Sequence, residues 1–340
     1  MNRLMVRKYD ALDEYDSALA AELRAHLPDK VFDVHAHPYF KPDVDVHTVP
    51  ILDDLPEDGG IDFWRQCLSL QIGRKHVAGG LFFGLPIIPI DDIAERIGQI
   101  NRFLIEELRK SCDTNARGLL LVARSSDPAE TELLLGEPHI AGFKPYPALN
   151  PGLGHAPDIH EFLPEWVCEL ANRRGLVIML HISKPAALDD EGNVAEINGL
   201  CSRYPGMKLI LAHAGAGFNM YNTIKGCLKI NKADNLWFDV SAICEHEPIA
   251  ALINEFGHER LMWGSDYPIS LRKGRFVTFG NMCFCLQRNT INTDMLSPAC
   301  LPALQGLENL RAVIHAITEC KLGSEQVEDL FYNNAAKLLL

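Results

Sequence analysis

The sequence lacks long apolar runs, basic clusters, internal repeats and low-complexity segments. No stretch approaches the roughly 20 apolar residues that a transmembrane helix needs. The N-terminal segment has no extended apolar core of the kind found in secretory signals, so we expect a cytoplasmic protein. The net charge is −13, and the Lys and Arg residues are scattered, which disfavours binding to nucleic acid. We therefore expect an enzyme-sized globular protein with small-molecule partners, and a homo-oligomer is compatible with the sequence.

The ten cysteines occur in a chain without an export signal, so we expect reduced thiols rather than disulfides. Cys283, Cys285, Cys300 and Cys320 could be imagined as a structural zinc knot. Their spacing fits no common knot, and the residues around the first two are apolar. We interpret these cysteines as packing residues, because free cysteine is often buried.

One short motif is more informative than the composition. The segment Asp33-Val34-His35-Ala36-His37 closes an apolar run. On a β-strand, residues two apart point the same way, so Asp33, His35 and His37 share one face. Two adjacent imidazoles can bind one divalent metal. A pair of hydrogen-bonded histidines at a strand end is the alternative for an isolated motif, but here the motif is not isolated.

Further apolar segments also end in a polar or metal-competent residue. These end positions are Lys144, His181, His213 and Asp266. A polar residue placed repeatedly at the carboxyl end of a buried strand is typical of the (β/α)8 barrel, where strand ends and the following loops form the active site. The combination indicates a metal centre.

The remaining periodicity supports the same α/β fold, a (β/α)8 TIM barrel, over a single domain of residues 1–340. An N-terminal helical extension (1–28) is a candidate for closing the barrel bottom. A long excursion (269–305) follows strand eight, and part of it is expected to cap the site. Alternating strands and helices imply parallel pairing and right-handed crossovers. The predicted strands are 31–35, 77–83, 118–123, 140–144, 176–181, 208–213, 236–240 and 261–266, and the helices between them are 62–75, 91–110, 128–135, 159–174, 193–204, 218–230 and 247–257.

With these motifs, the chain resembles the amidohydrolase superfamily from residue 33 onward, and the amidohydrolase 2 branch of metal-dependent hydrolases and related decarboxylases in particular. The resemblance implies that a divalent metal, Zn²⁺ or alternatively Mn²⁺, is ligated by four residues, His35, His37, His181 and Asp266. It also implies that His213 lies beside the metal as a catalytic or second-metal residue.

Two basic residues remain open to more than one interpretation. In binuclear relatives a lysine at the position of Lys144 carries a carbamate that bridges two metals. In the branch that the chain resembles, one metal is usual, and Lys144 would instead hold a substrate carboxylate or carbonyl. We favour the mononuclear alternative, because one metal with an open position suffices for hydrolysis. Arg124, after strand three, could clamp an anionic group or form a salt bridge at the rim.

The predicted activity is hydrolysis of a small amide, lactone or cyclic imide, with Asp266 as proton acceptor and His213 as the group that polarises the carbonyl. Lys144 and Arg124 would favour a substrate that carries a carboxylate. The rival is a lyase on the same scaffold that decarboxylates an aromatic or unsaturated acid without water attack. A barrel that binds a ligand without catalysis is a third alternative, which the intact set of polar strand ends disfavours.

Overall fold

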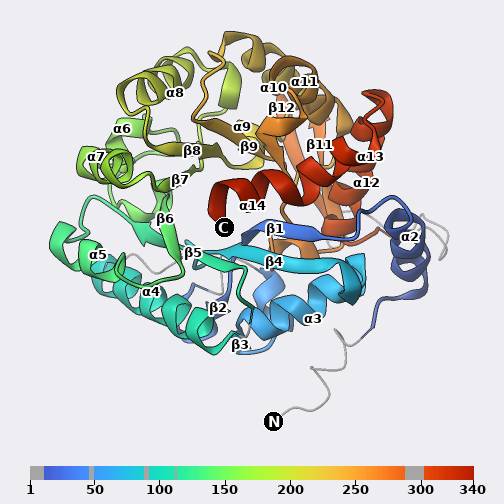
Figure 1. Cartoon of the computed structure of the whole chain (residues 1–340), viewed down its shortest axis with the longest axis horizontal. Coiled ribbons are helices and arrows are strands. Elements are labelled where there is room, and N and C mark those ends of the chain that lie inside the picture. The colour runs from blue at the N-terminus through green and yellow to red at the C-terminus, as the bar shows by residue number, and fades with distance from the viewer. Residues whose placement is uncertain (1–10, 46–49, 88–91, 112, 288–301) are drawn as a thin grey trace.

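The computed structural model describes residues 11–45, 50–87, 92–111, 113–287 and 302–340. Its centre is an eight-stranded sheet whose hydrogen-bonded neighbours are parallel and follow chain order. The strands are β1 (Val31–Ala36), β4 (Val77–Phe82), β5 (Ala116–Val122), β6 (Ile140–Pro145), β7 (Val177–Leu180), β8 (Lys208–Leu211), β9 (Leu236–Asp239) and β10 (Leu261–Met262). Figure 1 shows the strands as a ring surrounded by helices, which confirms the predicted (β/α)8 barrel.

Helices connect successive strands on the outside of the ring (Figure 1). They are α3 (Ile61–Ile72), α4 (Ile93–Lys110), α5 (Pro128–Leu134), α6 (Ile159–Phe162), α7 (Glu165–Arg174), α8 (Glu191–Arg203), α9 (His213–Ala216), α10 (Met220–Gly226) and α11 (His246–Phe256), followed by α12 (Gln305–Glu319), α13 (Ser324–Glu328) and α14 (Asn334–Leu339). The helix predicted over 159–174 is divided into α6 and α7. The division falls at Pro164, the N-cap of α7, because proline cannot continue the hydrogen-bond ladder of a helix.

A group of buried apolar side chains fills the inside of the barrel. It combines strand residues from around the ring, such as Phe32 and Met179, with Leu338 and Leu339 of α14. Residues from so many strands can meet only in the interior, so α14 closes that interior from below. Lys208, at the start of β8, donates to the Leu338 carbonyl at 2.9 Å. This bond satisfies one of the carbonyls that a helix end leaves free.

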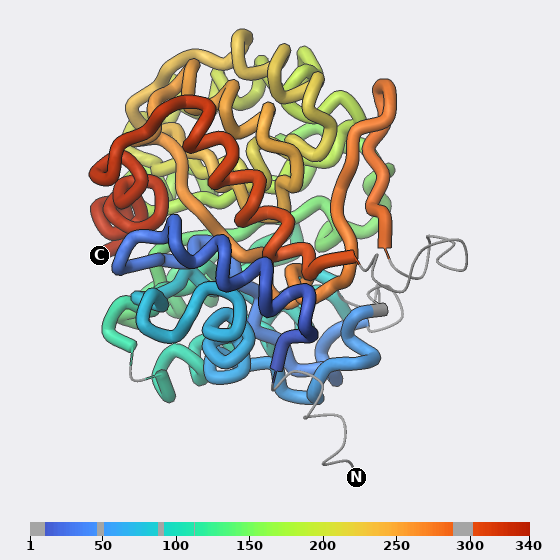
Figure 2. The backbone as a smooth tube through the Cα atoms, turned by 90° about the vertical axis from the view of Figure 1, so that its right-hand side faces the viewer, coloured from blue at the N-terminus to red at the C-terminus, as the bar shows by residue number. Residues whose placement is uncertain are grey.

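The N-terminal helix does not close the barrel bottom. This helix, α2 (Glu14–Arg24), lies alongside α12 and also packs on α3 (Figure 2). Arg24 donates to the main-chain oxygens of Leu70 and Gln71 at the end of α3, and Lys273 pairs with Asp16. The position at the bottom is taken by α14. The helices among the described residues do not combine the length and the apolar character that a membrane span requires.

The excursion after β10 contains a two-stranded antiparallel hairpin, β11 (Gly274–Phe279) and β12 (Met282–Gln287). Figure 2 shows this hairpin extending along one side of the molecule. Asn219, the N-cap of α10, donates to the carbonyls of Gly280 and Met282 and so ties the hairpin tip to the barrel. A second, shorter pair, β2 (Tyr39–Phe40) and β3 (Asp58–Gly59), lies in the connection after β1.

The cysteines agree with the prediction only in part, because five of those that the structure describes are buried, whereas Cys283, Cys285 and Cys320 are partly exposed. Eight cysteines lie in the described segments, and all of them are free thiols. Cys300 falls outside the described residues, so the rejected zinc knot is not tested as a complete set. Burial alone raises the pKa of Cys67 to about 12, as expected for an inert packing thiol.

Candidate metal centre and active site

The barrel closes between β1 and the segment after β10, and this seam brings together residues far apart in the sequence. The Asp266 amide donates to the His35 carbonyl at 2.8 Å, and the His37 amide donates to the Tyr267 carbonyl at 2.7 Å. A side chain at Gly264 would place its Cβ 2.7 Å from the His35 Cβ. The close approach of the two segments therefore requires glycine at this position.

A buried carboxylate reinforces the seam. Asp33 Oδ2 accepts hydrogen bonds from Trp64 Nε1 at 2.8 Å and from Ser265 Oγ at 2.5 Å. Its Oδ1 accepts from the main-chain amides of His35 at 3.0 Å and Ser265 at 2.8 Å. Burial raises the pKa of Asp33 to about 6 in spite of these bonds. Asp33 thus belongs to the scaffold that orients the site, because each of its two carboxylate oxygens accepts two hydrogen bonds from scaffold residues.

Three histidines share one pattern of hydrogen bonds. His35 Nδ1 lies 2.5 Å from Asp239 Oδ2, His37 Nδ1 lies 3.2 Å from a main-chain oxygen, and His213 Nδ1 lies 3.1 Å from the Ser241 carbonyl. Because these partners are acceptors, each ring is assigned its proton on Nδ1. The Nε2 atoms are then unprotonated, which is the form of imidazole that binds a metal.

The free nitrogens converge with a carboxylate oxygen. The Nε2 atoms of His35 and His37 are 3.2 Å apart, and each lies 3.5 Å from Asp266 Oδ1. Nitrogen ligands about 2.0–2.1 Å from a tetrahedral zinc lie roughly 3.3–3.4 Å apart. The donor set and its spacing therefore fit one divalent metal. Potential ligand atoms of His35, His213 and Asp266 also lie within 4.8 Å of one another, but the shorter separations favour His37 as the third member.

Asp266 is charged and held in an unusual backbone conformation. Its φ of 59° lies in the left-handed region, which a residue other than glycine adopts only where the surroundings enforce it. Burial opposes ionisation, but the neighbouring side chains of His37, His213 and His35 hold the pKa of Asp266 at about 2. Burial lowers the pKa of His37, and it lowers that of His35 far more. At neutral pH the site therefore combines neutral imidazoles with an ionised carboxylate.

His181 and His213 lie side by side, with ring centroids 5.2 Å apart. The His213 ring is also 4.6 Å from the His35 ring, so it faces the converging donors. His181 Nδ1 is buried and has no hydrogen-bond partner, and burial lowers the pKa of His181 well below its usual value. Of the four predicted ligands, His181 is the one that does not belong to the compact triangle of donor atoms.

Lys144 is fully buried, and its Nζ has no hydrogen-bond partner. Nζ lies 4.6 Å from the centroid of the Phe83 ring, and that ring also contacts His35 and His37. Burial lowers the pKa of Lys144 to about 7, although Asp239 and Asp266 favour its charged form. An amine that is buried without a partner beside the converging donors is available to bind a further group.

Arg124 lies apart from this buried cluster. Its main-chain amide donates to Asn150 Oδ1, and the residue is exposed. No ion pair links its guanidinium to another residue in the described segments. Neither the predicted clamp on a substrate anion nor the alternative salt bridge at the rim is established by these contacts.

Sequence reasoning missed Asp239, which is fully buried and binds His35. Its Oδ1 accepts from the Ser241 amide at 2.7 Å, and its Oδ2 accepts from Ser241 Oγ at 2.9 Å. The available signal was an aspartate after the apolar run Leu236–Phe238, similar to the other polar strand ends. The predicted strand extended through this position to Val240, so the aspartate was treated as part of the strand.

A cavity of about 430 Å³ opens beside His181. The loop after β7 contributes Ser183, whose Oγ is buried without a hydrogen-bond partner. Phe218 lines the cavity from the segment before α10, and Met282 and Cys283 line it from the hairpin. The expectation that the excursion covers the site is therefore correct for its hairpin. Residues 288–301 of the excursion lie outside the described residues.

Comparison with known sequences and structures agrees with this geometry. Residues 89–340, about three quarters of the chain, match the sequence model of the amidohydrolase 2 family, described as "Amidohydrolase". The chain belongs to the amidohydrolase 2 family. The match includes Lys144, His181, His213 and Asp266, whereas the two histidines of β1 lie before it. A search of curated proteins found no match.

Solved structures share the fold of this amidohydrolase at low sequence identity. A protein named as a candidate 2-pyrone-4,6-dicarboxylic acid hydrolase from Pseudomonas putida is 16% identical with a TM-score of 0.55, over 92% of this chain and 98% of that one. A dihydroxybenzoic acid decarboxylase from Polaromonas sp. JS666, with bound manganese and 2-nitroresorcinol, is 14% identical with a TM-score of 0.56, over 92% and 97%. A 4-oxalomesaconate hydratase from Rhodopseudomonas palustris is 13% identical with a TM-score of 0.55, over 91% and 95%. At these identities the likeness establishes the fold alone.

The Asp239–His35 hydrogen bond generates a first prediction for this amidohydrolase. Asp239→Asn should lower the affinity for a divalent metal about 10–100-fold, because a group that orients a ligating imidazole also raises its basicity. Competition with a chromophoric chelator measures the affinity. Asp62→Asn, at an exposed aspartate in α3, is the matched control. Equal affinities in Asp239→Asn and the unaltered chain would contradict a ligand role for His35.

Lys144 generates a second prediction. Its pKa of about 7 lies below the ordinary value of 10.5, so between these pH values the unfolded chain binds a proton that the folded chain does not. The unfavourable contribution of the buried Lys144 to the free energy of folding therefore has its full size below about pH 7. It disappears as the pH rises towards 10.5. Lys144→Met should stabilise the metal-free protein by about 1–3 kcal/mol at pH 6, with a smaller gain at pH 9.

Urea unfolding of the metal-free protein at both pH values measures this effect, with Lys225→Met at an exposed position in α10 as the control. A stability gain that grows with pH, or a loss of stability at pH 6, would show that the Lys144 amine is paired in solution.

Proposed function

We propose that the protein is a metal-dependent hydrolase of a small amide, lactone or cyclic imide that carries a carboxylate. The observation that carries the proposal is the convergence of His35 Nε2, His37 Nε2 and Asp266 Oδ1 at separations of 3.2–3.5 Å. His181 would complete the ligand set from the adjacent strand end. The ion is Zn²⁺ in this proposal, with Mn²⁺ as the alternative, since both accept imidazole and carboxylate ligands.

When bound, a divalent ion in such a site lowers the pKa of water to about 7 and so supplies a nucleophile near neutral pH. Asp266 is the proton acceptor, because its pKa of about 2 keeps it ionised. It would take the proton of the attacking water and pass it to the leaving group. A carboxyl group with so low a pKa is almost wholly ionised at neutral pH, so it has hardly any proton to donate to a carbon atom, and this supports water attack over protonation of carbon.

His213 is proposed to stabilise the negative charge that develops on the substrate oxygen. Its Nδ1 is engaged by the Ser241 carbonyl, so only Nε2 can face the substrate. To donate a hydrogen bond to the substrate oxygen, Nε2 must first take up a proton, because the Nδ1 proton is committed to Ser241. The positive charge gained in this way then stabilises the developing anion. Lys144 would bind the substrate carboxylate, since its Nζ is buried without a partner. In this mononuclear proposal Lys144 carries no carbamate. In this proposal Arg124 would contact the substrate at the outer edge of the site.

The rival function is non-oxidative decarboxylation of an aromatic or unsaturated acid. It is kept because one protein with this fold is a dihydroxybenzoic acid decarboxylase. In that reaction the carbon–carboxylate bond breaks, CO₂ leaves and a proton is added to carbon. No oxygen atom from water enters the organic product.

Isotopic labelling separates the two reactions. We expect the enzyme, screened on lactones, amides, cyclic imides and aromatic acids, to incorporate one atom of oxygen-18 from labelled water into the acid product. Mass spectrometry of the organic product reads the label, and a boiled sample is the control for spontaneous hydrolysis. An unlabelled product accompanied by CO₂ would decide for the lyase.

His213→Asn should retain most of the bound metal and lose about a hundredfold to a thousandfold in turnover. Asparagine keeps a polar group near Ser241 but has no atom at the position of Nε2. Metal content and turnover are measured on the same preparation. Loss of one of two metals would reject the mononuclear assignment, and unchanged turnover would reject a catalytic role for His213.

A further inference from the structure

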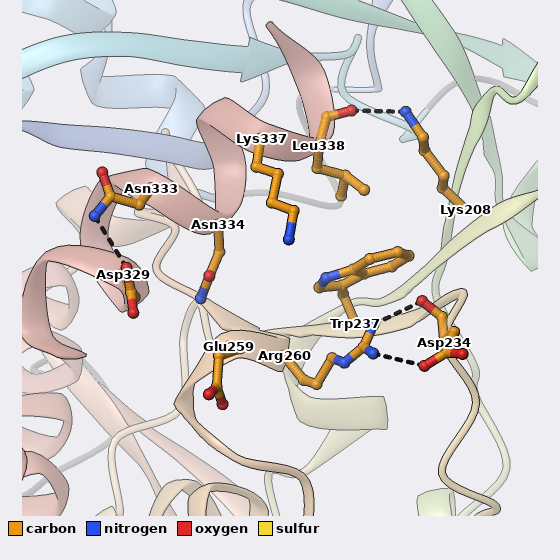
Figure 3. A pocket seen from close by; sticks show the side chains of 10 residues that line it. All are labelled: Lys208, Asp234, Trp237, Glu259, Arg260, Asp329, Asn333, Asn334, Lys337 and Leu338. Atoms are coloured by element: carbon orange, nitrogen blue, oxygen red, sulfur yellow. Dashed lines mark hydrogen bonds and ion pairs between the residues drawn. The ribbon is translucent and has the colours of Figure 1, made fainter.

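A second cavity, of about 570 Å³, lies at the opposite end of the barrel from the converging histidines. It forms where β8 and β9 begin and where α14 crosses the barrel bottom. Its walls include Lys208, Trp237, Arg260, Lys337 and Leu338 (Figure 3). The volume is within the range of small-molecule sites. None of the proposed catalytic residues lines it.

One face of the Trp237 indole is already occupied. The Arg260 guanidinium lies 5.1 Å from the ring centroid and is fixed by Asp234, through the main-chain oxygen at 2.6 Å and through Oδ1 at 3.1 Å. Figure 3 shows Arg260 on one side of the indole and Lys337 and Leu338 on the other. The side towards α14 therefore offers an aromatic surface next to an apolar side chain.

The carboxylates that line the cavity all have polar partners. Asp234 pairs with Arg260. Asp329 lies 3.1 Å from His258 Nε2, and its other oxygen accepts from Asn333. Glu259 lies 3.4 Å from His258 Nδ1. Asp234 is thus paired with a permanent cation, whereas Asp329 and the exposed Glu259 share the single His258 ring at the edge of the cavity.

The two lysines that line the cavity, Lys208 and Lys337, differ from these acids because neither forms an ion pair in the described segments. Lys208 donates to the Leu338 carbonyl, an acceptor without net charge. Within the described segments, the Lys337 ammonium forms no ion pair, and Figure 3 shows it directed into the space between Asn334 and Trp237. Within the described segments, both lysines thus lack an anionic partner, and they lie on the same side of the cavity as the indole face towards α14 (Figure 3).

We propose that this cavity binds a small planar aromatic carboxylate. The ring packs between Trp237 and Leu338, and aromatic rings in offset or edge contact contribute beyond the area that they bury. The carboxylate faces Lys337 and Lys208 and forms charge-assisted hydrogen bonds with them. This site is independent of the proposed catalytic reaction, because it uses other residues at the other end of the barrel.

Fluorine NMR on the full chain tests the proposal, with 4-fluorobenzoate as the probe and 4-fluorobenzylamine as its cationic counterpart. The benzoate should bind at millimolar concentrations and the amine more weakly. Lys337→Gln should weaken benzoate binding about three- to tenfold, as expected for loss of one charge-assisted contact. Trp237→Leu should weaken it similarly through loss of the aromatic surface. Lys225→Gln, at an exposed lysine outside the cavity, should have no effect.

Binding of the probe in the catalytic pocket is recognised because it would persist in both cavity variants and fall in His213→Asn. Circular dichroism verifies that each variant is folded, and Lys337→Gln carries the test alone if Trp237→Leu does not fold. Three outcomes overturn the proposal: no benzoate binding, unchanged affinity in either folded cavity variant, or binding of the amine as tight as that of the acid.

Discussion

The candidate site depends on closure of the barrel between its first strand and the segment after its last. His35 and His37 come from one side of this seam and Asp266 from the other, so their separations exist only when the seam is closed. The buried Asp33 carboxylate crosses it, with bonds to the Ser265 amide and hydroxyl. Burial disfavours an ionised carboxylate, as the raised pKa of Asp33 indicates. Two of the four hydrogen bonds that offset this cost come from Ser265 and form only in the closed barrel, which couples folding to assembly of the site.

Closure alone would bring the imidazoles together without setting their protonation. Acceptors behind each ring do this, because the Nδ1 proton is committed to Asp239, to a main-chain oxygen or to Ser241. The site also contains features that a scaffold selected for stability alone would avoid: the left-handed φ values of Asp266 and His213 and the unpartnered amine of Lys144. Each disfavours the folded state, and such features concentrate where binding or catalysis requires them.

The fold and much of the site could be predicted because they depend on local patterns. An apolar run followed by a polar residue can be recognised in the sequence, so the eight strands and the positions of His181 and His213 at strand ends were predicted. Contacts between segments that are distant in the sequence could not be predicted from these local patterns. Assigning Asp239 to the site would have required knowing that the end of β9 faces the His35 ring. The last strand was predicted to reach Asp266, but β10 ends at Met262, because the following residues turn to bond with β1. The packing of α2 on α12 likewise depends on tertiary contacts.

The carboxyl ends of the strands and the packed interior below them contain opposite kinds of structure for a physical reason. At the carboxyl ends of the strands, polar atoms must remain unengaged to receive a ligand, so they add little to the stability of the fold. The interior below them is filled by apolar side chains, and α14 completes that filling with Leu338 and Leu339. Phe83 belongs to this interior group and also contacts the His35 and His37 rings. The packed interior therefore supports the imidazoles from below, and rings held in this way lose little freedom when they bind a ligand.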